Sequence, residues 1–197
     1  MILSNIAIQA AIDAGDIVID PEPLPRLSSL QGGKSPYDTT AVNLRLSPSL
    51  SVCRKSMPMT FDLRTSGLPD FLKDHVYEPV TMDQDGGYCL PENQFVLGNT
   101  VEILTLPVRP GHPVYAARVE GRSSFARCGL LVHFTAPTIH ANFSGTITFE
   151  IMNFGKHPIT LHPGLPIGQL IFERVDGEPA LSESQFQNQR TPAGTKK

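Results

Sequence analysis

The sequence predicts a mainly β fold, either a barrel or a sandwich built from short strands. Eighteen prolines and 16 glycines among 197 residues imply many turns and leave little room for long helices. In the second half of the chain, short apolar runs are separated by Pro or Gly, which is typical of successive strands. We expect strands at residues 88–90, 94–104, 114–120, 130–134, 145–152, 159–161 and 167–174.

The N-terminal part of the chain adds one helix and two strands to this prediction. Residues 4–15 have the clearest helical pattern, because Ser4 is a suitable N-cap, apolar residues recur on one face and Gly15 can end the helix. Residues 17–21 form a short apolar run that ends at a proline. Residues 41–46 alternate apolar and polar side chains, as a half-buried strand does.

Three other segments have no strand pattern. Residues 22–37 are rich in Pro, Ser, Gly and Leu and are interpreted as a loop. Residues 53–82 have no steady period, so we expect a covering loop or a short helix around residues 69–75. The polar tail, residues 178–197, is expected to be disordered unless it folds over a ligand. The whole chain, residues 1–197, has the size of a single domain.

Composition narrows the class of protein. A net charge of −3 gives no basic footprint for nucleic acid. The N-terminus lacks the pattern of a signal peptide, and no apolar run approaches the roughly 20 residues that span a bilayer. Cys53, Cys89 and Cys128 are odd in number and widely spaced, which argues against a disulfide framework and a cysteine-built zinc site. We expect a cytoplasmic protein that binds neither nucleic acid nor a membrane.

The segment from Arg122 to Arg127 is the most informative part of the chain. Two guanidinium groups and the hydroxyls of Ser123 and Ser124 fall within six residues, at the start of an expected short helix. Free backbone N–H groups, a hydroxyl cap and positive charge together suit a phosphate. An ordinary capped helix with solvated arginines is the alternative.

A lone carboxylate, Glu150, follows in an otherwise apolar strand pattern. Ile147, Phe149 and Ile151 alternate with it, so Glu150 is expected on the opposite face. An outward glutamate in solvent is the simplest interpretation. If instead the side chain faces a sheltered cavity, desolvation would raise its pKa toward the range useful for proton transfer.

The histidines do not predict a metal site. His133, His140, His157 and His162 match no metal-binding helical pair, and the zinc deaminase signature is absent. There is also no phosphate-binding P-loop and no dinucleotide-binding glycine motif. We therefore expect no metal held by the protein itself.

Several motifs together resemble the dCTP deaminases, which belong to the trimeric dUTPase-like superfamily. The resemblance covers most of the chain and is most specific from Val114 to Phe172. The motifs that carry it are residues 1–4, 13–15, 42–46, 119–131, 133–136, 145–150 and 163–170.

This resemblance implies a distorted β-barrel that assembles as a homotrimer, with nucleotide sites at the contacts between subunits. Glu150 would be the catalytic acid and base, assisted by Ser123 and Arg127. No cofactor would be protein-bound, while Mg²⁺ would accompany the triphosphate and dTTP would be a possible feedback inhibitor. The implied substrate-binding residues are Arg122, Ser123, Ser124, Phe125, Ala126, Arg127, Ala136, His140, Thr148, Phe149, Gln169 and Gln189.

The implied chemistry needs only one tuned carboxylate. Replacing the C4 amino group of cytosine by oxygen requires an activated water and a proton delivered to the ring, and Glu150 can do both in turn. Ser123 would orient the water or stabilise charge at the reacting carbon, and Arg127 would keep Glu150 in place.

Two departures from the family pattern concern the sugar and the phosphates. The usual Ile-Asp-Pro-Gly turn is replaced by residues 139–142, where His140 takes the place of the aspartate. A neutral imidazole can bond the 3′-hydroxyl but serves poorly where a carboxylate must activate water beside phosphate. The tail also lacks the family's tyrosine and lysine, and Gln185 stands near the lysine position.

The leading hypothesis from sequence is hydrolysis of dCTP to dUTP and ammonia. One alternative is the bifunctional form that also removes diphosphate to give dUMP, against which the loss of the aspartate argues. Another is a catalytically inactive nucleotide-binding regulator, which His140 and the altered tail would suit. A plain dUTPase is disfavoured because its glycine-rich C-terminal motif is not seen.

Overall fold

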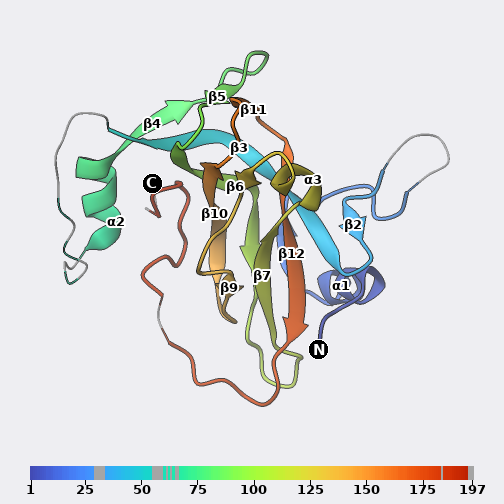
Figure 1. Ribbon diagram of the computed structural model, residues 1–197. Helices are drawn as coiled ribbons and strands as arrows, with labels where there is room; N and C mark the ends of the chain where they lie inside the picture. Colours follow the sequence, from blue (N-terminus) through green and yellow to red (C-terminus); the bar gives the residue numbers. More distant parts are fainter. Residues whose placement is uncertain are drawn as a thin grey trace.

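One strongly curled antiparallel sheet forms the body of the protein (Figure 1). The computed structural model describes residues 1–28, 34–54, 60, 62, 64, 67–182 and 184–194. The strands are β1 (Val18–Asp20), β2 (Tyr37–Asp38), β3 (Ala41–Cys53), β4 (Tyr77–Thr81), β5 (Tyr88–Leu90), β6 (Phe95–Thr105), β7 (Tyr115–Gly121), β8 (Leu130–Leu131), β9 (Thr138–Ile139), β10 (Ser144–Asn153), β11 (Ile159–Leu161) and β12 (Pro166–Arg174).

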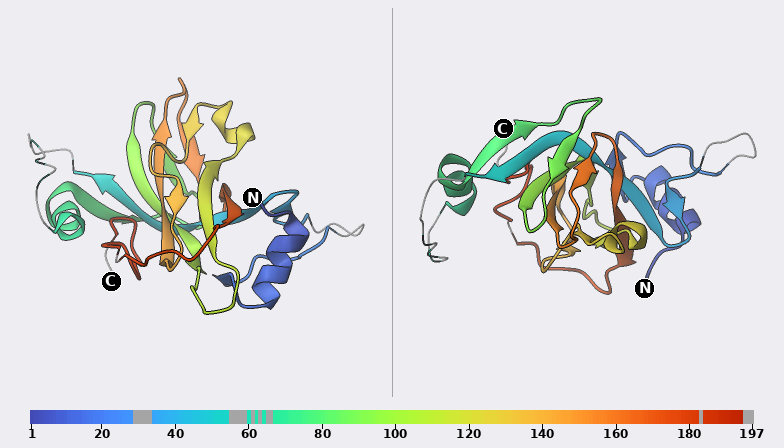
Figure 2. Two further views of the ribbon diagram at one scale, coloured as in Figure 1. Left: turned by 90° about the horizontal axis from the view of Figure 1, so that it is seen from below. Right: turned by 45° about the horizontal axis from the view of Figure 1, so that its top comes forward.

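The main sheet has the order β8-β10-β6-β3-β12-β7-β9, with β1, β2 and β4 paired at its side. It curls into a half-barrel, as the two views in Figure 2 show. Strands β5 and β11 form a separate two-stranded sheet. The predicted mainly β class is therefore confirmed.

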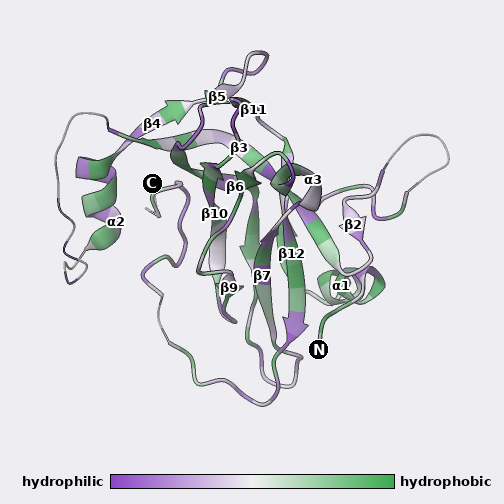
Figure 3. Cartoon of the chain, in the orientation of Figure 1, coloured by the Kyte–Doolittle hydropathy of each residue, from purple (hydrophilic) through white to green (hydrophobic). Residues whose placement is uncertain are grey.

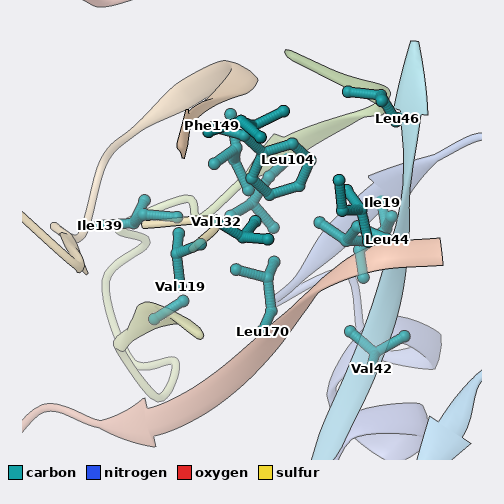
Figure 4. Close-up of a cluster of buried hydrophobic side chains, with 14 of the residues drawn as sticks. Ile19, Val42, Leu44, Leu46, Leu104, Val119, Val132, Ile139, Phe149 and Leu170 are labelled. Atoms are coloured by element: carbon teal, nitrogen blue, oxygen red, sulfur yellow. The ribbon is translucent and has the colours of Figure 1, made fainter. Parts of the chain in front are cut away.

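The hollow of the curled sheet holds the hydrophobic core (Figure 4). Alternate residues of β10, namely Ile147, Phe149 and Ile151, are buried there, as the two-residue period of a strand requires. Figure 3 shows the same alternation of hydrophobic and hydrophilic residues along the central strands. Burial of these side chains is the main stabilising contribution to the fold.

Most predicted strands are present, with ends shifted by no more than one or two residues. Two strands have lengths that differ from the prediction. The strand predicted at 41–46 continues to Cys53 as β3, passing through Pro48. The register between β3 and β6 shifts between Leu46 and Leu50, which marks a β-bulge. The bulge accommodates Pro48, which has no backbone N–H to donate to a neighbouring strand. The strand predicted at 130–134 ends at Leu131.

The predicted N-terminal helix is confirmed as α1 (Asn5–Asp13). The Oγ of Ser4 accepts a hydrogen bond from the backbone N–H of Ala7, and Gly15 follows the helix with a φ of 69°. Ile8 is buried against the sheet, so the helix covers the side of the barrel beside β2 (Figure 1).

The segment 53–82 contains more structure than the sequence indicated. The predicted helix near residues 69–75 is present as α2 (Leu68–Phe71), continued by a π-helical segment, η1 (Leu72–Val76). Strand β4 follows and pairs with β3, which was not expected. Part of this segment, and residues 29–33 of the expected loop 22–37, lie outside the described residues. The described part of that loop contains the unpredicted strand β2. None of the described helices is long and apolar enough to cross a membrane.

The described part of the C-terminal tail, residues 178–182 and 184–194, does not behave as a disordered extension. The N–H of Asn188 donates to Ser144 O over 2.7 Å, and the N–H of Thr146 donates to Gln189 O over 3.1 Å. Ala193 is buried. The tail is ordered because it adds backbone hydrogen bonds to β10 and places an apolar side chain against the sheet.

An ion pair between a partly exposed arginine and a buried glutamate joins β3 to β6. The Glu102 side chain is fully buried, and its Oε1 lies 2.6 Å from the Nε of Arg45. The backbone N–H of Arg45 donates to Glu102 Oε2 over 3.0 Å. A buried carboxylate is tolerated only when it is paired in this way.

We predict that Arg45→Ala lowers the free energy of unfolding by about 3 kcal/mol, because it leaves the buried charge of Glu102 without its partner. Arg118→Ala is the matched control, since Arg118 pairs with Glu173 where both side chains are partly exposed. The free energy of unfolding of Arg118→Ala should fall by less than about 1 kcal/mol. Urea unfolding measures both, and equal losses would contradict the role given to the buried pair.

Candidate active site

Strand β10 presents Glu150 and Thr148 on the face away from the core. In the register with β6, Glu150 lies opposite Leu97 and Thr148 lies opposite Asn99. The predicted orientation of Glu150 is therefore confirmed. The side chain is half-buried rather than free in solvent, and its Oε2 accepts a hydrogen bond from the N–H of Phe134 over 3.3 Å.

The loop that supplies this N–H is held by an aromatic cluster. The ring of Phe134 lies 6.1 Å from that of Phe95 in an edge-to-face arrangement and 6.2 Å from that of Phe154 in a tilted one. Ala136 is in the same loop and is exposed. The cluster fixes the loop, so that the backbone of Phe134 can orient the carboxylate of Glu150.

Tyr77 of β4 is a buried titratable side chain whose pKa responds to Glu150. Burial raises the pKa of the Tyr77 phenol, and the neighbouring Cys53 thiol and Glu150 carboxylate raise it further. The phenol therefore keeps its proton at physiological pH. Sequence reasoning missed Tyr77 because it lies in the segment 53–82, which has no regular period.

The C-terminal tail covers the same face of the sheet. The hydroxyl of Thr148 donates to Pro192 O over 3.3 Å, and the Nδ2 of Asn99 donates to Arg190 O over 3.3 Å. Gln189 is buried, and its Nε2 donates to Thr146 O over 2.7 Å. The structure thus brings three predicted site residues, Glu150, Thr148 and Gln189, to one face of β10.

The Arg- and Ser-containing segment lies at the end of β7, where α3 (Ser123–Ala126) begins. The predicted hydroxyl cap is wrong. Arg122, with φ −93° and ψ 130°, occupies the N-cap position and makes no side-chain cap. The helix starts one residue earlier than a Ser123 cap would require, and the side chains of Ser123 and Ser124 are exposed.

The Arg122 guanidinium is held in place by two contacts. Its Nη1 donates to Pro166 O over 3.0 Å, and its Cζ lies 5.6 Å from the centre of the Phe125 ring. Ala126 and Arg127 are exposed at the end of α3.

The other predicted site residues lie apart from β10's outer face. Gln169 of β12 donates through Nε2 to Asp38 Oδ2 over 2.9 Å and to Asn43 Oδ1 over 3.2 Å. His140 is exposed at the end of β9. Phe149 has 1% of its surface exposed, so its side chain belongs to the core and only its backbone remains available to a ligand.

The predicted site therefore forms two groups within one chain. Glu150, Thr148 and Gln189 meet on β10, while the α3 segment and Gln169 lie around the start of β12. Among the described residues, no hydrogen bond or ion pair links Glu150 to Ser123 or Arg127. Within the described part of one chain, Glu150 and the segment from Arg122 to Arg127 are thus not joined by a direct polar contact.

These features define a curled β-sheet protein with a strand carboxylate and a basic, hydroxyl-bearing helix start. A family model described as dCTP deaminase-like matches residues 2–175. The chain belongs to the dCTP deaminase-like family, as its motifs predict.

Relatives of similar length support this assignment. The chain is 33% identical over 203 residues to "dCTP deaminase, dUMP-forming" of Corynebacterium glutamicum (strain R), covering 100% of this chain and 96% of the relative. It is 34% identical over 198 residues to the protein of the same name from Parafrankia sp., covering 98% and 88%.

A solved structure confirms the fold. The 2′-deoxycytidine 5′-triphosphate deaminase from Agrobacterium tumefaciens matches with a TM-score of 0.59 and 21% sequence identity. The match covers 89% of this chain and 48% of that chain, so this chain spans about half of the solved one.

We predict that Gln189→Ala loosens the tail while the barrel stays folded, because the substitution removes a buried hydrogen bond to Thr146. Such a bond contributes about 1 kcal/mol or more, so cleavage by trypsin after Arg190 should become about tenfold faster. Gln185→Ala, at an exposed tail position, is the control and should change nothing. Equal cleavage rates for wild type and Gln189→Ala would show that this bond does not hold the tail.

Proposed function

We propose that the chain hydrolyses the amino group at C4 of the cytosine of dCTP. The observation that carries the proposal is the position of Glu150, which a backbone N–H orients on the outer face of β10. The membership of the chain in the dCTP deaminase-like family supports the same activity.

The Glu150 carboxylate can perform both proton transfers of this reaction. It takes a proton from water, the resulting hydroxide attacks C4, and the protonated Glu150 gives that proton to N3 of the ring. The tetrahedral carbon then loses the amino group as ammonia, with the remaining hydroxyl proton passing through Glu150 to the leaving nitrogen. The ring keeps the new oxygen at C4, and the balance is dCTP and water to dUTP and ammonia.

We propose that the working unit is a homotrimer in which two chains complete each site. The α3 segment of one protomer would face β10 of its partner, bringing Ser123 and Arg127 to Glu150. The separation of these groups within one chain supports this arrangement, because an active site needs its charged groups within hydrogen-bonding reach. Closed cyclic assemblies repeat such a contact at every interface.

The nucleotide would arrive with Mg²⁺ on its phosphates, and the protein itself would hold no metal or other cofactor. The guanidinium groups of Arg122 and Arg127 and the exposed serines of α3 suit the phosphates. A site of this kind would also accept dTTP as a competing ligand. The reaction would take place in the cytoplasm, where deoxynucleotide precursors are used.

We propose dUMP and diphosphate as the final products, in place of the dUTP expected from the sequence. The full-length relatives in Corynebacterium and Parafrankia are named as dUMP-forming, which supports a second hydrolysis at the phosphates. The exposed His140 favours the alternative in which the reaction stops at dUTP, since a neutral imidazole lacks the negative charge of the carboxylate that would activate water beside phosphate.

The purified protein incubated with dCTP and Mg²⁺ should release ammonia and dUMP in equal amounts, with diphosphate, as resolved by anion-exchange chromatography. Accumulation of dUTP without dUMP would favour the alternative product. Binding of dCTP without any turnover would contradict the proposed activity and favour a nucleotide-binding regulator.

In the same assay, Glu150→Gln should lower kcat by at least about 100-fold, because the amide cannot carry the proton. Its melting temperature should stay close to that of the wild type. Glu78→Gln is the matched control, since Glu78 is an exposed carboxylate on β4. Full activity of Glu150→Gln would overturn the mechanism.

A further inference from the structure

A pocket of about 600 Å³ opens next to the start of α3. Its walls come from the residues after β1, those before β2, the middle of β3 and the start of β12. Three cationic side chains line it, Lys34, Arg45 and Arg122, together with the carboxylate of Glu22. The pocket therefore adjoins the anion-binding group of the candidate site without including Glu150.

The charges around the pocket do not cancel. Glu22 Oε1 lies 2.6 Å from the Nε of Arg26, and this hydrogen bond holds the pKa of Glu22 below its usual value. Arg45 is neutralised by the buried Glu102. Among the described residues, Lys34 and Arg122 have no carboxylate partner. The pocket therefore keeps the positive charge of these two side chains.

The position of the pocket indicates which ligand its positive charge could bind. Arg122 is both a wall of the pocket and the residue directly before Ser123, so the pocket continues from the exposed hydroxyls of α3. Its volume exceeds that of a single phosphate group. A chain of phosphates that begins at α3 can therefore extend past Arg122 toward Lys34.

The tail offers no comparable charge in its described part. The cationic side chain in the described part of the tail is Arg190, and its Nη1 donates to the backbone carbonyl of Gln189. A nucleoside triphosphate carries several negative charges, and these need several donors in one place. The pocket supplies such donors on the α3 side of the proposed site.

We propose that this pocket binds the terminal phosphates of the nucleotide and that Lys34 is a phosphate-binding residue. The inference rests on the proposed function. In a dUMP-forming reaction these are the phosphates that leave as diphosphate, so Lys34 and Arg122 would neutralise the leaving group as charge develops on it.

The test measures polyphosphate binding and turnover separately. Inorganic tripolyphosphate is titrated into the full-length protein by calorimetry, and KM and kcat are measured with dCTP. Lys34→Ala should weaken tripolyphosphate binding and raise the KM for dCTP, each about tenfold, because one charge-assisted contact is lost. Inhibition by deoxycytidine, which has no phosphate, should not change.

Two further variants serve as controls. Lys34→Arg keeps the charge and should retain most of the tripolyphosphate affinity. Lys73→Ala removes an exposed lysine on η1, away from the pocket, and should behave as the wild type. Arg45→Ala is unsuitable because it leaves the buried Glu102 unpaired.

The outcomes separate this inference from the proposed function. Unchanged tripolyphosphate binding in Lys34→Ala, in an enzyme that turns over dCTP, would overturn the phosphate pocket alone. Binding that depends on Lys34, in a protein that never turns over dCTP, would support the pocket and overturn the deamination.

Discussion

The pairing of β10 with β6 is the constraint on which the rest of the structure depends. Phe149 fills the core, and it can do so because position 168 on β12 is a glycine. A Cβ there would come within 2.5 Å of the Phe149 ring. With Phe149 inside, the two-residue period of the strand directs Glu150 outward. A slip of one residue would exchange the two faces and bury the carboxylate in the core.

The outer face of β10 becomes a chemical site because other segments cover it. The loop at Phe134 supplies a donor to Glu150, the charge of Glu150 acts on the buried phenol of Tyr77 in β4, and the tail bonds to Thr148. These segments are far apart in sequence, and each is held by its own packing or hydrogen bonds. The Glu150 side chain is half-buried and keeps a hydrogen-bond partner, which fits the proposed role in proton transfer.

The parts of the fold that follow local rules could be predicted from the sequence. The alternation around Glu150 gives its strand and its face, and the caps at Ser4 and Gly15 give α1. The features that were missed depend on contacts distant in sequence. Strand β4 forms only because the long β3 offers an edge with which it can pair. The residues around Tyr77 therefore contain no local sequence pattern that would predict a strand there. The ordered tail likewise needs β10 as its partner.

In the proposed trimer, Glu150 of one protomer acts together with the α3 segment of another. Mixing two inactive variants, Glu150→Gln and Arg127→Ala, in reassembled trimers tests it most directly. If the site is shared between chains, random assembly regenerates intact sites and restores about a quarter of the wild-type activity. If mixed trimers form, as native mass spectrometry can verify, and activity stays absent, the shared site is contradicted.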